Sequence, residues 1–334
     1  MTDPALQNLL DDAWHIESHN ITPLSGGNIN ETYAVDDRFI LQWLNPIFGA
    51  AVNDDIASLV PILKQNAVPV PELIATKRGA WWTDGERVGT KKGIWRLMTK
   101  LPGKSLMAVE NIDQIRALAR MLGRFHKALL DSHYTFRHTR GFAHDFDKHW
   151  RAFDQAYETL KNHEVWPQVH LLREKIEHLK RFVHPDVTLQ SETKRIIHGD
   201  PKCANFMFLQ NDVCGVIDLD TMTRSSISCD IGDAIRSWCN AHSENDAPEF
   251  MPEYAREALG EYEETTPFLT KEERENLASA APCIALELGI RFARDALCED
   301  YFGFDPQIGH AKHSLLRAQN QVELAAQMLM STNT

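Results

Sequence analysis

Residues 196–220 constrain the fold of this chain more than any other segment. They read IIHGDPKCANFMFLQNDVCGVIDLD. Two apolar runs flank a loop that contains Asp200, Lys202 and Asn205, and a further apolar run ends at Asp218. Apolar runs that alternate with turn residues predict a strand, a loop, a strand, a turn and a strand. Such an arrangement would bring two carboxylates, an amide and an ammonium group close together.

These four side chains are the set that phosphoryl transfer in a kinase-type site requires. Asp200 would accept a hydrogen bond from a substrate hydroxyl and take its proton late in the reaction. Lys202 would neutralise charge on the phosphoryl group in flight. Asn205 follows Asp200 at the offset of the H-R-D-x-x-x-x-N loop of protein kinases. With Asp218 it would ligate Mg²⁺ through oxygen atoms, in the crevice between two lobes.

Each residue also has an ordinary structural reading, since an Asp in a loop is most often a turn former. The H-G-D triplet, the Asn offset, the hairpin and the final Ile-Asp together favour the catalytic reading. His198 is expected to tie the loop to neighbouring backbone. Gly199 stands where protein kinases carry an Arg that couples the site to a phosphorylated segment. We therefore expect a permanently assembled site and a small-molecule acceptor rather than a protein.

The composition excludes several classes of partner. The chain has 334 residues, a net charge of −12 and 43% hydrophobic residues, which predicts two domains or lobes with ordinary cores. Nucleic-acid binding requires a basic face, which the acidic balance argues against, and anionic membranes are disfavoured likewise. The N-terminus has no signal-peptide pattern, no apolar run approaches the roughly 18 residues of a membrane span, and the six cysteines form no C-x-x-C pair. We expect a cytoplasmic protein with reduced thiols, and nothing in the sequence specifies an oligomeric state.

The order of predicted elements divides the chain near residue 101. Residues 1–101 contain a short N-terminal helix, a helix over 50–66 and strand-like stretches such as RFILQWL, VPELIAT and GIWRLMTK. Residues 102–334 are mostly helical, with apolar stripes at spacings of three and four, interrupted by the strand-rich segment. This layout predicts an α+β, bilobal, protein-kinase-like fold with a β-rich N-lobe (1–101) and a mostly helical C-lobe (102–334).

The segments HGDPKCAN, IDLD and VPVPELIAT together resemble the aminoglycoside phosphotransferase/choline kinase superfamily of small-molecule kinases. Within it, the chain is most similar to N-acetylhexosamine 1-kinases. That likeness rests on GGNINETY (26–33), ILQWLN (40–45), DPKCAN (200–205), IDLDT (217–221) and RFARDALCEDYF (291–302). The resemblance implies an ATP- and Mg²⁺-dependent kinase that phosphorylates a sugar hydroxyl, the anomeric hydroxyl of an N-acetylhexosamine.

The chain departs from the kinase pattern in its N-lobe. The strand that should carry the nucleotide-gripping Lys reads FILQWL, with Gln42 near that position, and the helix over 50–66 has no Glu to pair with such a Lys. The hexosamine kinase motif also has Gln there, so activity is still expected. Pro201 and Cys203 differ from the sugar-kinase loop, which leaves the acceptor open.

Nucleotide-binding residues are expected in the Gly-rich turn between two predicted strands and in the strip between the lobes. Backbone amides of Gly26, Gly27 and Asn28 would approach phosphate oxygens, although the two glycines alone would indicate a plain hairpin turn. Gln42 would lie near the phosphates. Met98 and Leu101 belong to the strip between the lobes, where adenine would bind.

For the acceptor, the resemblance points to the polar face of the helix around 285–298 and to residues just past the metal strand. The candidates are Asp220, Arg224, Glu287, Arg291, Arg294 and Tyr301. The charged groups would hydrogen-bond sugar hydroxyls and the aromatic ring would stack on the sugar. The alternative is a set of i, i+4 salt bridges on a solvated helix face. His126 is expected in the core, and the spacing of the histidines over 133–149 does not favour a zinc site.

Two further hypotheses stay open. One keeps the chemistry but changes the acceptor to an amino alcohol, homoserine or an aminoglycoside. The other, from a different class, is a nucleotide-binding pseudokinase module. The missing Lys and Glu motivate this reading, and the intact Asp200, Asn205 and Asp218 argue against it.

Overall fold

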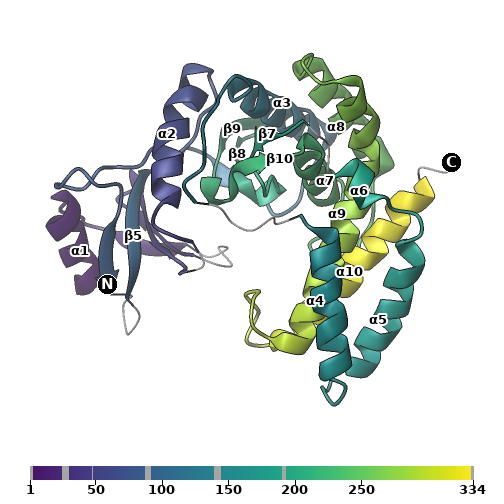
Figure 1. Ribbon diagram of the computed structural model, residues 1–334. Coiled ribbons are helices and arrows are strands. Elements are labelled where there is room, and N and C mark those ends of the chain that lie inside the picture. Colours follow the sequence, from purple (N-terminus) through teal and green to yellow (C-terminus); the bar gives the residue numbers. More distant parts are fainter. Residues whose placement is uncertain are drawn as a thin grey trace.

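The computed structural model describes residues 3–24, 30–46, 48–86, 92–138, 144–189 and 193–331. These residues form a smaller lobe built on a sheet and a larger helical lobe (Figure 1). The predicted α+β architecture, with a β-rich N-terminal lobe and a helical C-terminal lobe, is confirmed. The boundary at residue 101 stays a prediction, although the large sheet ends close to it, at Thr99.

A five-stranded antiparallel sheet forms the N-lobe. Its strands lie in the order β1 (Ile21–Leu24), β2 (Glu31–Val35), β3 (Phe39–Leu44), β5 (Lys92–Thr99) and β4 (Thr83–Glu86). The register of β3 and β5 places Gln42 opposite Arg96. Helix α1 (Pro4–Trp14) begins at the N-cap Asp3 and buries Leu6, Leu10 and Trp14 in one cluster with sheet residues.

Helix α2 (Val52–Gln65) links the two lobes. Its buried residues, including Ile56 and Leu59, belong to the larger hydrophobic cluster, which contains Leu44 and Leu73 of the N-lobe as well as the core of the C-lobe. They do not belong to the smaller cluster beneath α1. The N-lobe therefore has a small core of its own beneath α1, and α2 belongs to the cluster that continues into the helical lobe.

The C-lobe is assembled around the 28-residue helix α9 (Lys271–Cys298), which contacts α4, α7 and α10. A capping box between Thr270 and Glu273 starts α9, and most of its length is buried. The other helices are α3 (Ile112–Ala128), α4 (Phe146–Thr159), α5 (Trp166–Leu179), α6 (Pro185–Thr188), α7 (Ile227–Trp238), α8 (Pro252–Thr265) and α10 (His310–Ser331).

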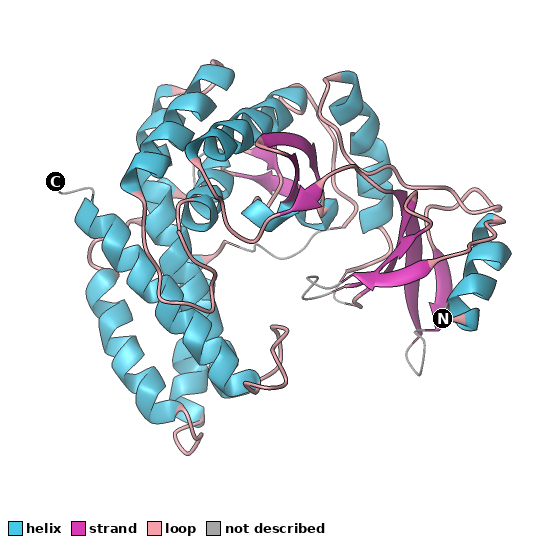
Figure 2. Ribbon diagram, turned by 180° about the vertical axis from the view of Figure 1, so that it is seen from behind, coloured by secondary structure: helices cyan, strands magenta, loops and turns pink. Residues whose placement is uncertain are grey.

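Two small sheets lie among these helices (Figure 2). One pairs β7 (Arg195–Ile197) with β10 (Thr223–Ser225), and the other joins β6 (Lys104–Ser105), β8 (Phe206–Leu209) and β9 (Asp212–Val216). Short 3₁₀ turns, η1 (Cys203–Asn205) and η2 (Leu219–Thr221), follow the loop after β7 and the end of β9. The predicted strand–loop–strand–turn–strand reading of 196–220 is confirmed.

The prediction of a strand at VPELIAT is wrong. The segment runs beside β5 but makes a single bridge, between Leu73 and Met98. Pro69 and Pro71 have no N–H to donate to a ladder. The carbonyl of Pro69 instead accepts a hydrogen bond from Val216 N at 2.9 Å, so this segment ties the N-lobe side of the chain to β9.

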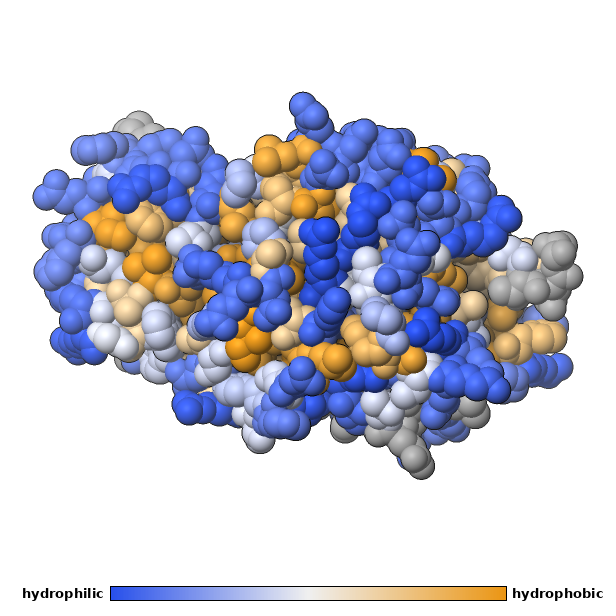
Figure 3. All heavy atoms as spheres, turned by 90° about the horizontal axis from the view of Figure 1, so that it is seen from above, coloured by the Kyte–Doolittle hydropathy of each residue, from blue (hydrophilic) through white to orange (hydrophobic). Residues whose placement is uncertain are grey.

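The surface alternates in character. On the face in Figure 3, apolar residues lie in several separate groups divided by hydrophilic side chains. Within the described ranges, every helix is too short or too polar to cross a bilayer. The six cysteines are free thiols, and Cys203, Cys229, Cys239 and Cys283 are buried.

Candidate active site

The loop after β7 turns sharply at Gly199, and this turn aims Asp200. Gly199 has a φ of 83°, a region that disfavours side chains, and a Cβ there would lie 2.3 Å from the carbonyl oxygen of Thr221. Glycine is therefore required by both the backbone angle and the space. His198 secures the far side of the turn, because its Nε2 contacts the carbonyl oxygen of Ile217 at 2.9 Å. The predicted structural role of His198 agrees with this contact.

Asp230, near the start of α7, fixes the same loop through hydrogen bonds to its backbone. Its two carboxylate oxygens accept the backbone N–H groups of His198 and Gly199, both at 2.7 Å. His126 Nε2 lies 2.9 Å from the same carboxylate and its Nδ1 lies 2.7 Å from the Tyr262 hydroxyl. Burial raises the pKa of Asp230, but the hydrogen bond and charge of His126 outweigh it, and the net pKa is lowered. His126 is thus a buried core histidine, as predicted.

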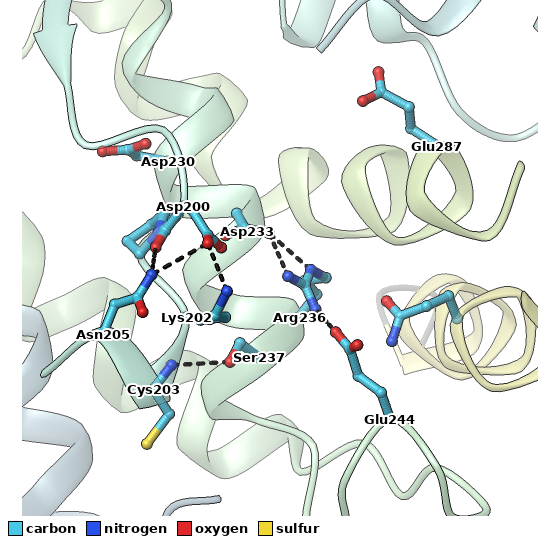
Figure 4. A network of polar contacts seen from close by, with 12 residues as sticks. Asp200, Lys202, Cys203, Asn205, Asp230, Asp233, Arg236, Ser237, Glu244 and Glu287 are labelled. Carbon is cyan, nitrogen blue, oxygen red and sulfur yellow. Dashed lines mark hydrogen bonds and ion pairs between the residues drawn. The ribbon is translucent and has the colours of Figure 1, made fainter. Parts of the chain in front are cut away.

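Asp200, Lys202 and Asn205 are in direct contact (Figure 4). Lys202 Nζ donates to Asp200 Oδ2 at 2.6 Å, and Asn205 Nδ2 donates to the carbonyl oxygen of Asp200 at 2.7 Å and to its Oδ2 at 3.2 Å. Burial opposes ionisation of Asp200, but the charge and hydrogen bond of Lys202 dominate and lower its pKa to about 2. The Asp200 carboxylate raises the pKa of Lys202 in turn. Both groups are charged at neutral pH.

Asp218 lies beside this trio. Ile217 N donates to the carbonyl oxygen of Asn205 at 2.9 Å, and Asp218 itself adopts a left-handed conformation with φ 61°. Burial raises the pKa of Asp218, and the nearby carboxylates of Asp220 and Asp200 raise it further, against the opposing charge of Lys202. A cation would relieve this crowding of negative charge. Because the Asn205 amide donates through nitrogen, its oxygen remains a donor atom, and Asn205 with Asp218 fits the few oxygen ligands that Mg²⁺ takes from protein.

A second polar group on α7 adjoins Asp200. Arg236 Nε donates to Asp233 Oδ1 at 2.7 Å, and its Nη1 contacts Glu244 Oε1 at 2.7 Å. Figure 4 shows Asp233 and Arg236 on one helix next to Asp200, with Glu244 beyond them. Burial raises the pKa of Asp233, and the charge of Asp200 adds to that effect, whereas Arg236 opposes it.

His144 and Glu287 form a further buried pair on this side of the lobe. His144 Nδ1 lies 3.1 Å from Glu287 Oε1. Burial lowers the pKa of His144, but Glu287 and then Asp233 raise it more, with Arg291 opposing, and the net pKa is raised. Among the described residues, buried polar atoms without a partner include His144 Nε2, Glu287 Oε2 and Asp233 Oδ2.

The remaining predicted acceptor residues already have protein partners. Asp220 is 2% exposed and pairs with Arg96, and Arg224 Nε donates to the carbonyl oxygen of Tyr134 at 3.2 Å. Arg294 pairs with Asp300 at the end of α9. The Arg291 guanidinium lies 5.9 Å from the centre of the Tyr301 ring, and Tyr301 is 39% exposed. Acceptor roles for these residues stay predictions.

The predicted nucleotide residues are only partly in view. Gly26, Gly27 and Asn28 lie outside the described residues. Gln42 Nε2 donates to Thr32 Oγ1 at 3.0 Å, and its Oε1 accepts from Arg96. Met98 is half-buried on β5. The Leu101 side chain packs against Gly215 on β9, so closely that a Cβ on Gly215 would lie 2.5 Å from it. Roles of Gln42, Met98 and Leu101 toward a nucleotide stay predictions.

Sequence reasoning missed Asp230, Asp233, Arg236 and His144. The first three come from CDIGDAIR, directly after the metal strand, where two acidic residues three apart on a helix that is otherwise apolar are a usable signal. Charged residues on a buried helix face need partners, and here those partners are the catalytic loop and its neighbours.

A two-lobe α+β fold that sets an Asp–Lys–Asn loop beside a second Asp defines a phosphotransferase of the kinase type. Over residues 20–268, more than half of its length, the chain matches the phosphotransferase enzyme family (APH). The chain belongs to that family, which confirms the resemblance to the aminoglycoside phosphotransferase/choline kinase superfamily. The finer likeness to N-acetylhexosamine 1-kinases stays a prediction.

Solved structures support the fold over the whole chain. An aminopropanol kinase associated with a microcompartment is 17% identical with a TM-score of 0.64, and the match covers 98% of each chain. An amicoumacin kinase bound to AMP-PNP, Ca²⁺ and its antibiotic is 14% identical with a TM-score of 0.62, covering 98% of this chain and 94% of that one. An ADP-bound aminoglycoside phosphotransferase is 13% identical with a TM-score of 0.58, covering 98% and 99%.

Proposed function

We propose that this phosphotransferase uses ATP and Mg²⁺ to phosphorylate a small-molecule hydroxyl, and that the acceptor is the anomeric hydroxyl of an N-acetylhexosamine. The observation that carries the chemistry is the contact of Asp200 with Lys202 and Asn205 beside Asp218. An intact set of this kind argues against the pseudokinase alternative, because a scaffold has no need of all four groups.

The charge state of Asp200 defines its task. A carboxylate with a pKa of about 2 is a weak base at neutral pH, so Asp200 would orient the acceptor hydroxyl and take its proton only as the new bond forms. Lys202 would balance charge between Asp200 and the incoming phosphoryl group. Mg²⁺, when bound, supplies positive charge to the phosphates, and Asn205 and Asp218 are the residues that would hold it.

Buried polar atoms of His144, Asp233 and Glu287 support a hydroxyl-rich acceptor, on the side of the lobe where Asp233 adjoins Asp200. Glu287 Oε2 and Asp233 Oδ2 are acceptors, and His144 Nε2 becomes a donor when the ring is protonated, which its raised pKa favours. Mixed donors and acceptors suit the hydroxyl and acetamido groups of a sugar. The surplus of carboxylates favours the second candidate acceptor, a cationic amino alcohol or aminoglycoside. Similar solved structures that are named for such acceptors also support this candidate.

An acceptor panel tests the proposal. The full chain would be incubated with ATP, Mg²⁺ and, singly, N-acetylglucosamine, N-acetylgalactosamine, glucose, aminopropanol, homoserine and an aminoglycoside, with ADP release as the signal. We expect turnover with an N-acetylhexosamine and none with its 1-O-methyl glycoside, whose anomeric hydroxyl is blocked. Turnover with a cationic acceptor alone would select the second candidate.

Asp200→Asn is the matched control for chemistry. The amide cannot accept a proton but keeps the size of the side chain, so ADP release should fall by a factor on the order of 10³ while nucleotide binding persists. If the wild-type chain bound ATP and no acceptor produced ADP above the acceptor-free background, the kinase proposal would fail.

A further inference from the structure

Arg96 carries a charge at a place from which water is excluded. It lies on β5, is 2% exposed, and faces Gln42 on β3. Its Nη1 donates to Asp220 Oδ1 at 2.6 Å and its Nη2 donates to Asp220 Oδ2 at 2.9 Å. This is a bidentate pair between a strand of the N-lobe and the η2 turn of the C-lobe.

The rest of the guanidinium is also engaged. Nε donates to Gln42 Oε1 at 2.9 Å, Nη2 contacts the same oxygen, and Nη1 lies 3.4 Å from Asn53 Oδ1 on α2. A guanidinium has five N–H donors, and these contacts occupy them all. Arg96 is therefore not a group held ready for a phosphate oxygen; it acts through the residues it binds.

Asp220 connects Arg96 to two parts of the site. Its Oδ2 also accepts from Asn30 Nδ2 at 3.0 Å, and Asn30 Oδ1 accepts the backbone N–H of Asn45 at 2.9 Å. Asp220 is two residues from Asp218 along the chain. One buried carboxylate thus binds Asn30, just before β2, and Arg96 on β5, close along the chain to the proposed metal ligand.

The residues around Arg96 differ from the kinase pattern at two positions. Gln42 occupies the position at which the kinase pattern places a Lys, and α2 contributes Asn53 but contains no Glu. In this chain the buried positive charge lies on the neighbouring strand, at Arg96, and its acidic partner, Asp220, lies in the C-lobe.

We propose that the Arg96–Asp220 pair is a positioning device that sets strands β3 and β5 against Asp218, in place of the Lys–Glu pair that this chain lacks. The proposal rests on the proposed nucleotide-dependent function. A nucleotide held by both lobes depends on their relative placement, so the pair should govern nucleotide and Mg²⁺ affinity more than the chemical step.

Three variants separate positioning from simple stability. Arg96→Met leaves the buried Asp220 carboxylate without its cationic partner. Asp220→Asn leaves the buried Arg96 guanidinium without its anionic partner. The double variant removes both charges. Each single variant should raise KM for ATP and the Mg²⁺ concentration for half-maximal rate by about tenfold, with a smaller change in kcat. The double variant should regain most of the lost melting temperature, because no isolated buried charge remains, but should keep the raised KM.

Arg195→Met is the matched control. Arg195 makes a partly buried bidentate pair with Glu273, at 2.6 and 2.9 Å, within the C-lobe alone. It should lower the melting temperature without changing KM for ATP or the Mg²⁺ requirement. Arg96→Lys, which keeps the charge but not the fork, serves if Arg96→Met does not fold, and should show the same KM effect in weaker form.

Failure of the positioning proposal can be distinguished from failure of the proposed kinase function. Suppose that the wild-type chain phosphorylates an acceptor. The positioning proposal is then overturned if KM for ATP is unchanged in the Arg96 and Asp220 single variants. It is also overturned if KM for ATP returns to the wild-type value in the double variant together with the melting temperature. If the wild-type chain has no ATP-dependent turnover, the proposed function fails instead. Binding of a fluorescent ATP analogue still tests the pair in that case: unchanged affinity in Arg96→Met would overturn it.

Discussion

Asp200 lies between opposing influences on its charge. Burial favours the neutral acid, and the ammonium of Lys202 at 2.6 Å favours the carboxylate strongly enough to bring the pKa to about 2. Lys202 therefore has two tasks that can be measured separately, the ionisation of Asp200 and the stabilisation of the transferring phosphoryl group.

Lys202→Met should affect both. Without the ammonium, burial dominates, so the pKa of Asp200 rises and the acidic limb of the kcat/KM profile moves to higher pH. Loss of the cation should also lower kcat by a factor on the order of 10². A pH–rate profile of wild type and variant measures both effects, and an unmoved acidic limb would contradict the assignment of Lys202 as the group that keeps Asp200 ionised.

His144 makes a pH-dependent contribution to stability. Burial and Arg291 lower its folded-state pKa, but Glu287 and Asp233 raise it more, so the net pKa lies above the ordinary histidine value. A raised histidine pKa contributes stability that is fully present below the unfolded pKa and is lost as pH rises through the folded pKa. His144→Gln should therefore cost about 2 kcal/mol at pH 5.5 and less at pH 8.5. Urea unfolding at both pH values measures this, and an equal cost at both would contradict it.

At the scale of elements, the turn between β7 and η1 is the most constrained segment of the site. Gly199→Ala would force a Cβ to within 2.3 Å of the Thr221 carbonyl oxygen at a φ of 83°. We expect a cost of about 2 kcal/mol or more and a large loss of kcat, because Asp200 follows directly.

Gly260→Ala provides the contrast. Gly260 lies within α8, and a Cβ there would have no heavy atom within 4 Å. Alanine should stabilise this helix by about 0.5–1 kcal/mol and leave activity unchanged. Thermal unfolding and an activity assay of both glycine variants measure the pair, and a neutral Gly199→Ala would contradict the assigned role of the turn.

The elements that follow from local pattern were predictable, and the contacts between distant elements were not. Strand alternation and the Asn offset identify Asp200, Asn205 and Asp218 because all lie in one segment. Arg96 and Asp220 are 124 residues apart, and His144 and Glu287 are 143 apart, so nothing local relates them. The strand prediction at VPELIAT failed because its composition suits a strand while its prolines prevent a ladder.

At the scale of the whole molecule, two cores of unequal size determine how the chain responds to perturbation. The smaller one, beneath α1, contains Leu10, Trp14 and Trp95, while α2 belongs to the larger one. The N-lobe sheet and α1 therefore form the less extensive cooperative unit, and we expect them to open before the C-lobe does.

Leu10→Ala tests this difference. Leu10 is fully buried, so truncation should cost about 2–5 kcal/mol. Hydrogen exchange should accelerate in α1 and β1–β5 and stay unchanged in α9 and α10. Leu171→Ala, at a position 66% exposed on α5, should change stability by less than about 0.5 kcal/mol. Uniform acceleration across both lobes would contradict the separate-core interpretation.

The alkylation rates of the buried thiols measure how often the structure around them opens. Only a thiolate attacks an alkylating reagent, and burial raises the pKa of Cys203 and Cys229 to about 12, so neither reacts while covered. Cys203 sits between Lys202 and Asn205, and its labelling rate therefore records how often the catalytic loop itself comes apart. A ligand that closes the site would slow that rate, so the thiol reports acceptor binding without any turnover.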